Sequence, residues 1–190
     1  TLYLEYDGDG HVLRYETYDE NGNLELQVQN TFQDGTLQKS EQYNGAGSLT
    51  RTTTFTTQEN ADGSTVRISQ AFDQNGMFYY SSKEERDAGG TLLRSSSLDE
   101  DGSVSSVTEY EMNSDGTEIA NTYDSDGTLS WQSYLDDKGR PERSVFYDET
   151  GGTESESVYR YDADGFRLQK EVFRAGELSE TTAYTFSEDG

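Results

Sequence analysis

Short polar stretches recur along the chain, and each carries an apolar residue near both of its ends. The first apolar residue lies two or three positions after a glycine, and the second, usually aromatic, about six positions later. Successive side chains of a β-strand alternate between faces, so an even separation places both residues on one face. The pairs with even separation are Val12/Tyr18, Leu24/Phe32, Leu37/Tyr43, Leu49/Phe55, Val66/Phe72, Leu92/Leu98, Val104/Tyr110, Ile119/Tyr123 and Leu178/Tyr184.

A turn signal separates these stretches. Most turns read Asp/Asn-x-x-Gly, as in Asp19-Glu-Asn-Gly22 and Asp162-Ala-Asp-Gly165. An Asp or Asn in first place accepts hydrogen bonds from following backbone N–H groups, and the Gly supplies the positive φ of a bulge after a type I turn. The recurring glycines, spaced by roughly 13 residues, are at 10, 22, 35, 47, 63, 76, 90, 102, 116, 127, 139, 152, 165, 176 and 190.

These patterns together predict an all-β protein. A helix would need apolar residues spaced by three and four, and a glycine in every unit would break it. A two-sheet sandwich would need a continuous apolar inner face on each strand. We therefore expect a tandem-repeat antiparallel β-meander that forms one elongated, twisted or spiralling sheet. Residues 1–190 should form a single continuous array of about 14 strands.

Composition changes this picture in one respect. A net charge of -24 and a hydrophobic content of 30% are typical of disordered chains, but an aromatic content of 12% with one proline is not. The acidic balance argues against binding to nucleic acid, and no apolar run is long enough for direct insertion into a membrane. The chain has no cysteine, which excludes disulfides and thiolate zinc sites. It does not begin with Met, so we leave open a signal peptide or lipid anchor upstream.

The recurring motif also resembles a known family. Tyr18-Asp19-Glu-Asn-Gly22-Asn-Leu24, Tyr123-Asp124-Ser-Asp-Gly127-Thr-Leu129 and Tyr159-Arg-Tyr161-Asp162-Ala-Asp-Gly165 resemble the YD repeats of RHS-type bacterial surface and toxin-shell proteins. The resemblance, which continues through Leu178 to Phe186, implies a long sheet that winds into a spiral or shell on secreted or cell-surface proteins. Carbohydrate binding is implied for some members. The units here are shorter than usual, and no protease segment or toxin tip accompanies them. Short Tyr-x-x-Asn-Gly-x-Leu repeats of antitoxin-like and lipoprotein families are a related resemblance.

Metal and catalytic chemistry have little support. Asp-x-Asp-Gly turns suggest weak Ca²⁺ binding, but turn chemistry already accounts for both residue types, and no EF-hand spacing is present. His11 is the single histidine and has no partner for a metal site or a catalytic triad. A pair of carboxylates at glycosidase spacing would be a coincidence without a dry pocket. We expect no metal site, no cofactor and no enzymatic activity.

Aromatic residues are the candidate binding groups. Trp131 is predicted on the same face as Leu129, with Tyr134 nearby, and Tyr79 and Tyr80 are predicted to present rings on both faces of one strand. Exposed rings on a sheet can stack on sugars; the alternative is that these rings pack across strands.

The functional hypothesis is a non-catalytic secreted or cell-surface repeat scaffold that interacts with a protein or a glycan. One alternative is a carbohydrate-binding module. Another is an immunity- or antitoxin-type protein that binds a basic effector by charge.

Overall fold

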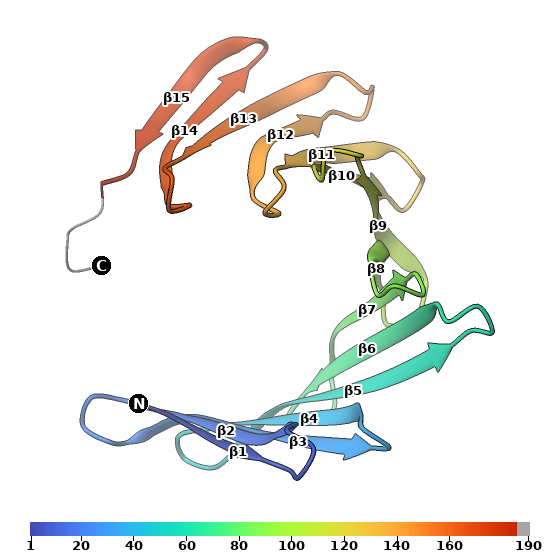
Figure 1. Cartoon of the computed structure of the whole chain (residues 1–190), viewed down its shortest axis with the longest axis vertical. Helices are drawn as coiled ribbons and strands as arrows, with labels where there is room; N and C mark the ends of the chain where they lie inside the picture. Colours follow the sequence, from blue (N-terminus) through green and yellow to red (C-terminus); the bar gives the residue numbers. More distant parts are fainter. Residues whose placement is uncertain (186–190) are drawn as a thin grey trace. The chain divides into compact units, whose positions relative to one another are not determined.

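The computed structural model describes residues 1–185 as an all-β protein (Figure 1). Its 15 strands form one sheet in which the strand order follows the chain order, as the sequence predicts. The strands are β1 (Leu2–Tyr6), β2 (Val12–Tyr18), β3 (Leu24–Gln33), β4 (Thr36–Asn44), β5 (Leu49–Glu59), β6 (Thr65–Asp73), β7 (Phe78–Arg86), β8 (Leu92–Leu98), β9 (Val104–Met112), β10 (Glu118–Asp124), β11 (Leu129–Leu135), β12 (Pro141–Tyr147), β13 (Thr153–Tyr161), β14 (Arg167–Arg174) and β15 (Glu177–Ala183).

The number of strands exceeds the expected 14 by one. The steps between turn glycines count only the strands that follow a glycine, whereas β1 precedes Gly10. The chain divides into two compact units, Thr1–Val104 and Ser105–Gly190. The described residues contain no helix with the length and apolar character needed to span a membrane.

Most hairpins close on the predicted four-residue turn. In the first, the Gly10 N–H donates to the Asp7 carbonyl and the Asp7 N–H donates to the His11 carbonyl. Gly10 has a φ of 88°, which L-residues rarely adopt. In the β12–β13 turn the residue with positive φ is Gly151 and not Gly152, because the turn starts at Asp148. The expected glycine at 190 lies outside the described residues.

Two hairpins use a tighter turn than expected. Asp34 and Gly35 have φ values of 50° and 74°, and Ala175 and Gly176 have values of 49° and 79°. Two consecutive residues with positive φ define a type I′ turn, whose twist matches that of the flanking strands. Both sequences lack an Asp or Asn three positions before the glycine, so the side-chain acceptor of the longer turn is missing.

A β-bulge follows nearly every turn at a fixed place. In the β2–β3 hairpin Tyr18 pairs with Leu24 and Thr17 pairs with Leu26, which leaves Glu25 as the extra residue. The extra residue is the third after the turn glycine in all of the bulged hairpins. The β5–β6 and β9–β10 hairpins are regular. The Tyr and Leu of the repeat motif are therefore cross-strand partners beside the turn.

The bulge corrects the prediction that both apolar residues of a strand share one face. An extra residue shifts the alternation of side chains by one. Val12 therefore lies on the face opposite Tyr18, and Leu24 on the face opposite Phe32. The prediction is right for Val66/Phe72 and Ile119/Tyr123, where no bulge intervenes. Apolar residues are thus distributed over both faces, and neither face is apolar enough to need a second sheet.

Small side chains occupy the centre of the sheet in residues 105–185. Ala120, Ser133, Ser144, Ser157 and Val172 are successive cross-strand partners from β10 to β14, and all five are buried. Longer side chains on the same face flank this row, among them Trp131 and Phe146, whose ring centroids are 6.3 Å apart. The opposite face holds Val145, which is 1% exposed. Burial in this unit therefore comes from neighbouring side chains of the same sheet.

We predict that acid destabilises the fold through its turn aspartates. Asp73 Oδ1 accepts hydrogen bonds of 2.8 Å from the backbone N–H groups of Asn75 and Met77, and the Met77 bond is the main cause that lowers the Asp73 pKa. A carboxyl group whose pKa is lowered in the folded state stabilises the fold at pH values above its unfolded-state pKa of about 3.9. This stabilisation is lost as the pH falls through the pKa of the folded state. The other turn aspartates with a lowered pKa are Asp7, Asp19, Asp62, Asp101, Asp115, Asp126, Asp136 and Asp148.

The measurement is the urea midpoint between pH 6 and pH 2 in high salt, which suppresses the repulsion among the other charges. The midpoint should fall steeply below about pH 4. Asp73→Asn should keep the fold at pH 6 and reduce this fall, because Asn44 already accepts the same two backbone bonds as a neutral side chain. A midpoint that does not change down to pH 2 would contradict the prediction.

Candidate functional site

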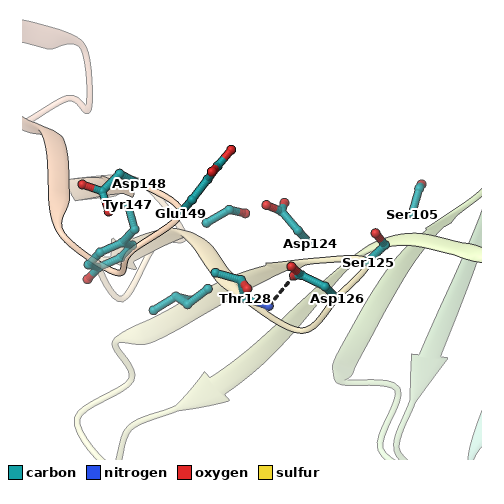
Figure 2. A pocket seen from close by; sticks show the side chains of 10 residues that line it. Ser105, Asp124, Ser125, Asp126, Thr128, Tyr147, Asp148 and Glu149 are labelled. Atoms are coloured by element: carbon teal, nitrogen blue, oxygen red, sulfur yellow. Dashed lines mark hydrogen bonds between the residues drawn. The ribbon is translucent and has the colours of Figure 1, made fainter.

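An acidic groove lies along one margin of the sheet within residues 105–185 (Figure 2). Its volume is about 670 Å³. The turn between β10 and β11 and the turn between β12 and β13 form most of its walls, because alternate turns of a meander lie at the same margin. The lining residues are Ser105, Asp124, Ser125, Asp126, Thr128, Leu129, Ser130, Tyr147, Asp148 and Glu149.

Four carboxylates line the groove, and turn hydrogen bonds hold two of them, Asp126 and Asp148, in place. Asp126 Oδ1 accepts the Thr128 N–H at 2.9 Å, and this backbone bond is the main cause that lowers the pKa of Asp126. Asp148 Oδ1 accepts the Thr150 hydroxyl at 2.6 Å and the Gly152 N–H at 2.9 Å. The Thr150 hydroxyl is the main cause that lowers the pKa of Asp148. Both groups are therefore ionised at neutral pH and fixed in orientation.

The other two carboxylates are free to meet a ligand. Asp124 and Glu149 are exposed, and neither side chain has a hydrogen bond or ion pair within the described part of the chain. No Lys or Arg is among the lining residues. Four carboxylates without a neighbouring cation create a negative potential that attracts positively charged groups. Hydroxyl groups and the Tyr147 ring add hydrogen-bonding and stacking surface.

Tyr79 and Tyr80 form an aromatic patch in residues 1–104, but on one face and not on two as predicted. Their ring centroids are 5.8 Å apart in an edge arrangement, and the Arg51 guanidinium lies 4.3 Å from the centroid of Tyr79. Tyr79 is the extra residue of the β7 bulge, which places its side chain beside that of Tyr80. Tyr80 is the cross-strand partner of Ala71, whose exposed fraction is 0%. The patch thus covers part of the sheet and exposes the rest of its rings.

Trp131 and Tyr134 do not form one site. They are three positions apart in β11 and therefore lie on opposite faces of the sheet. The bulge at Ser130 also places Trp131 and Leu129 on opposite faces. The prediction that Trp131 and Leu129 share a face is therefore wrong. Tyr134 donates to Gln132 Oε1 at 2.6 Å and lies 5.2 Å from the Arg143 guanidinium.

Three ligating atoms of Asp7, Asp9 and His11 lie within 4.8 Å of one another in the first turn. Hydrogen bonds within the turn already use the Asp7 carboxylate: its Oδ2 bonds His11 Nδ1 at 2.8 Å and its Oδ1 accepts two backbone N–H groups. His11 stacks on Phe32 with centroids 4.7 Å apart. These contacts order the turn, and weak Ca²⁺ binding there stays a prediction.

The groove was missed by the reasoning from sequence. Its members are the ordinary turn residues of the repeat, and the sequence alone does not identify which turns lie beside each other with free carboxylates. One local signal is present: in the four-residue turns that end in Asp-Gly-Ser/Thr, the third-position Asp accepts the N–H two residues later, as in Asp62, Asp101, Asp115 and Asp126. In the β10–β11 turn this leaves the first-position Asp124 free.

Comparison with known proteins does not assign a family. No family model matches the sequence, and no curated protein matches it. Similar solved structures include a porin-like protein from Bacteroides uniformis, with 11% identity, a TM-score of 0.41 and coverage of 88% of this chain and 87% of that one. A Bacteroides fragilis protein of unknown function has 12% identity, a TM-score of 0.24 and coverage of 86% and 94%. A Photorhabdus luminescens Tc holotoxin pore has 12% identity and a TM-score of 0.19, with coverage of 90% of this chain and 13% of that one.

Proposed function

We propose that the protein is a non-catalytic interaction scaffold whose acidic groove binds a positively charged surface of a partner protein. The observation that carries this proposal is the set of four carboxylates, Asp124, Asp126, Asp148 and Glu149, around one groove without a lining cation. The overall charge of -24 extends the attraction beyond the groove. Charge complementarity of this kind raises association rates and selects partners by sign.

The turns support this function because they make the groove rigid before a partner arrives. Asp126 and Asp148 are already held by backbone and hydroxyl groups, so their side chains lose little conformational freedom on binding. Asp124 and Glu149 offer free oxygens to Lys or Arg, and the carboxylate–guanidinium pair is a strong charge-assisted bond. No proton transfer is required at any of these positions. The scaffold therefore needs no catalytic group.

The test uses a lysine-rich peptide as the basic probe and isothermal titration at low salt. We predict that Asp124→Asn combined with Glu149→Gln weakens binding roughly tenfold, since each exposed charge contributes a few tenths to one kcal/mol. Both substitutions keep the shape of the side chain and leave the turn hydrogen bonds in place. The matched control is Asp137→Asn combined with Glu142→Gln, which removes two exposed charges of the same unit outside the groove.

The control should bind almost as tightly as the parent protein, and salt should weaken binding of both. Equal losses in the two double variants would show that only net charge matters and would refute the groove as the binding surface. Binding that does not respond to salt would refute the basic partner.

Glycan binding is the second candidate function. Tyr147 lines the groove among four hydroxyl-bearing residues, and Phe146 exposes its ring beside Trp131. Rings and hydroxyl-rich surfaces suit sugars. A glycan array with Trp131→Ala and Tyr147→Ala separates the two sites, and absence of binding to any glycan argues against this function.

The resemblance of the motifs to YD repeats supports a wider role on secreted or cell-surface bacterial proteins. An immunity-type role would be a special case of the same groove, with a basic effector as the partner. Both belong to the proposal, and identification of the partner by cross-linking in the producing cell would decide between them.

A further inference from the structure

One turn within residues 105–185 holds an arginine between a carboxylate and an aromatic ring. Arg140 follows the turn glycine Gly139, and its Nε donates to Asp136 Oδ2 at 2.7 Å. The guanidinium carbon of Arg140 lies 4.7 Å from the ring centroid of Tyr161, which is the last residue of β13 before the next turn at the same margin. Asp136, which bonds this arginine, is 9% exposed. Arg140 thus bridges two neighbouring turns.

The first turn of residues 1–104 has the same arrangement with a histidine. His11 follows the turn glycine Gly10, and its Nδ1 lies 2.8 Å from Asp7 Oδ2. Its ring stacks on Phe32 with centroids 4.7 Å apart. Phe32, like Tyr161, pairs across the bulge beside the next turn at the same margin. In both places a planar group that carries nitrogen lies between the first-position Asp of one turn and the ring beside the next.

The acidic groove contains the same carboxylate and ring without the bridging group. Asp124 is the first residue of its turn, as Asp136 is, and Tyr147 pairs across the bulge beside the next turn, as Tyr161 does. Figure 2 shows Asp124 and Tyr147 on the two turns that line the groove. The residue after the turn glycine is Thr128, whose short side chain carries no cation. Asp124 is accordingly exposed.

The space that Arg140 fills is open in the groove. A Cβ added to Gly165, the glycine of the β13–β14 turn, would lie 2.9 Å from Arg140 Nη1. Gly151 has the same place in the β12–β13 turn, and no atom lies within 4 Å of its added Cβ. The groove of about 670 Å³ therefore has room for an arginine side chain from outside the chain.

We propose that the groove binds an arginine side chain of the partner protein, with its guanidinium between the Asp124 carboxylate and the Tyr147 ring. This inference rests on the proposed function and names the group that the groove recognises. A planar guanidinium donates two parallel hydrogen bonds to a carboxylate and stacks on a ring, whereas a lysine ammonium acts as a point charge. Glu149, whose place in the β13–β14 turn is taken by Ala163, adds a second acceptor.

The Tyr147 ring is already fixed for this contact. Its hydroxyl donates to Gln132 Oε1 at 3.2 Å, and Gln132 Nε2 donates to Asn121 Oδ1 at 2.7 Å. These bonds anchor the hydroxyl end of the ring, while the ring itself lines the groove. A guanidinium that stacks on it therefore immobilises little that is free.

The experiment compares two peptides of equal length and charge in which glycine alternates with arginine or with lysine. In isothermal titration at low salt the arginine peptide should bind roughly fivefold more tightly, because it adds stacking to the charge attraction. Tyr147→Leu should bring the ratio of the two affinities close to one. Tyr161→Leu is the matched control and should keep the ratio, because Arg140 already lies over that ring. Partial unfolding of a variant does not alter this ratio, since both peptides meet the same protein.

The second variant, Thr128→Arg, supplies the bridging group from within the chain. It should weaken binding of the arginine peptide roughly tenfold, because the new side chain competes for Asp124 and Tyr147. The matched control is Thr117→Arg, which adds the same charge after the turn glycine of the β9–β10 turn, at the other margin. This control should weaken binding only slightly.

The outcomes separate this inference from the proposed function. If neither peptide binds, the basic-partner function fails and the arginine site fails with it. If both peptides bind the parent protein with equal affinity, the function stands and the arginine site is refuted. Equal losses in Thr128→Arg and Thr117→Arg would also overturn the arginine site, because they would show that only net charge matters.

Discussion

Val145→Asp is expected to unfold the strands around β12, at a cost of more than about 3 kcal/mol. Val145 is 1% exposed and is the cross-strand partner of Glu156 and of Gln132. An aspartate there would be cut off from water and would lie directly opposite the Glu156 carboxylate. Arg143 already pairs with Glu156 at 2.7 Å, so it cannot neutralise both anions.

Urea denaturation followed by tryptophan fluorescence measures this effect, because Trp131 is the single tryptophan and lies in the neighbouring strand. Phe146→Asp is the matched control: it places the same residue one position further on, where the side chain is exposed. The control should lose only about 1 kcal/mol through its contact with Trp131. Equal losses in the two variants would show that Val145 does not anchor the sheet.

Gly45→Ala is expected to destabilise residues 1–104 by about 2 kcal/mol or more. A Cβ at this position would collide with the carbonyl oxygen of Leu24, and its third nearest atom would be the Glu25 Cα at 3.5 Å. These are backbone atoms of β3, so no rotation of a side chain relieves the contact. Either the β4–β5 turn or the start of β3 would have to move.

Gly8→Ala is the control for this prediction. It occupies the same second place of its turn, but no atom lies within 4 Å of its added Cβ. Its φ is not in the positive range, so the substitution should be neutral or slightly stabilising. Thermal unfolding followed by circular dichroism compares the two. A Gly45→Ala protein as stable as Gly8→Ala would contradict the close approach of turn and strand.

Much of the fold follows from local chemistry, which is why it is predictable. Asp73 and Gly76 specify a turn through bonds within five residues, and each strand pairs only with its sequence neighbours. The face of the sheet on which each side chain lies is harder to predict. The bulge at Glu25 or Ser130 depends on how two strands fit beside a turn, and a period-two pattern in one strand contains no information about it. The same error misplaced Trp131 relative to Leu129.

The candidate site was less predictable than the fold. The rings of Tyr79 and Tyr80 are conspicuous in a polar sequence, but their common face arises from the bulge in β7. Asp124 and Glu149 are indistinguishable in sequence from the acidic residues of other turns. Their role depends on two turns that line one groove and are separated by about two repeat units in sequence.

The pairing of each strand with its sequence neighbours has a mechanical consequence. A load applied to the two ends of such a sheet meets its hydrogen bonds one strand at a time and not all together. Each strand that peels away releases a length of chain and leaves the next hairpin as the new edge. An array of this kind that is tethered at both ends would unfold in small steps at low force, and it would refold from the hairpins that remain folded.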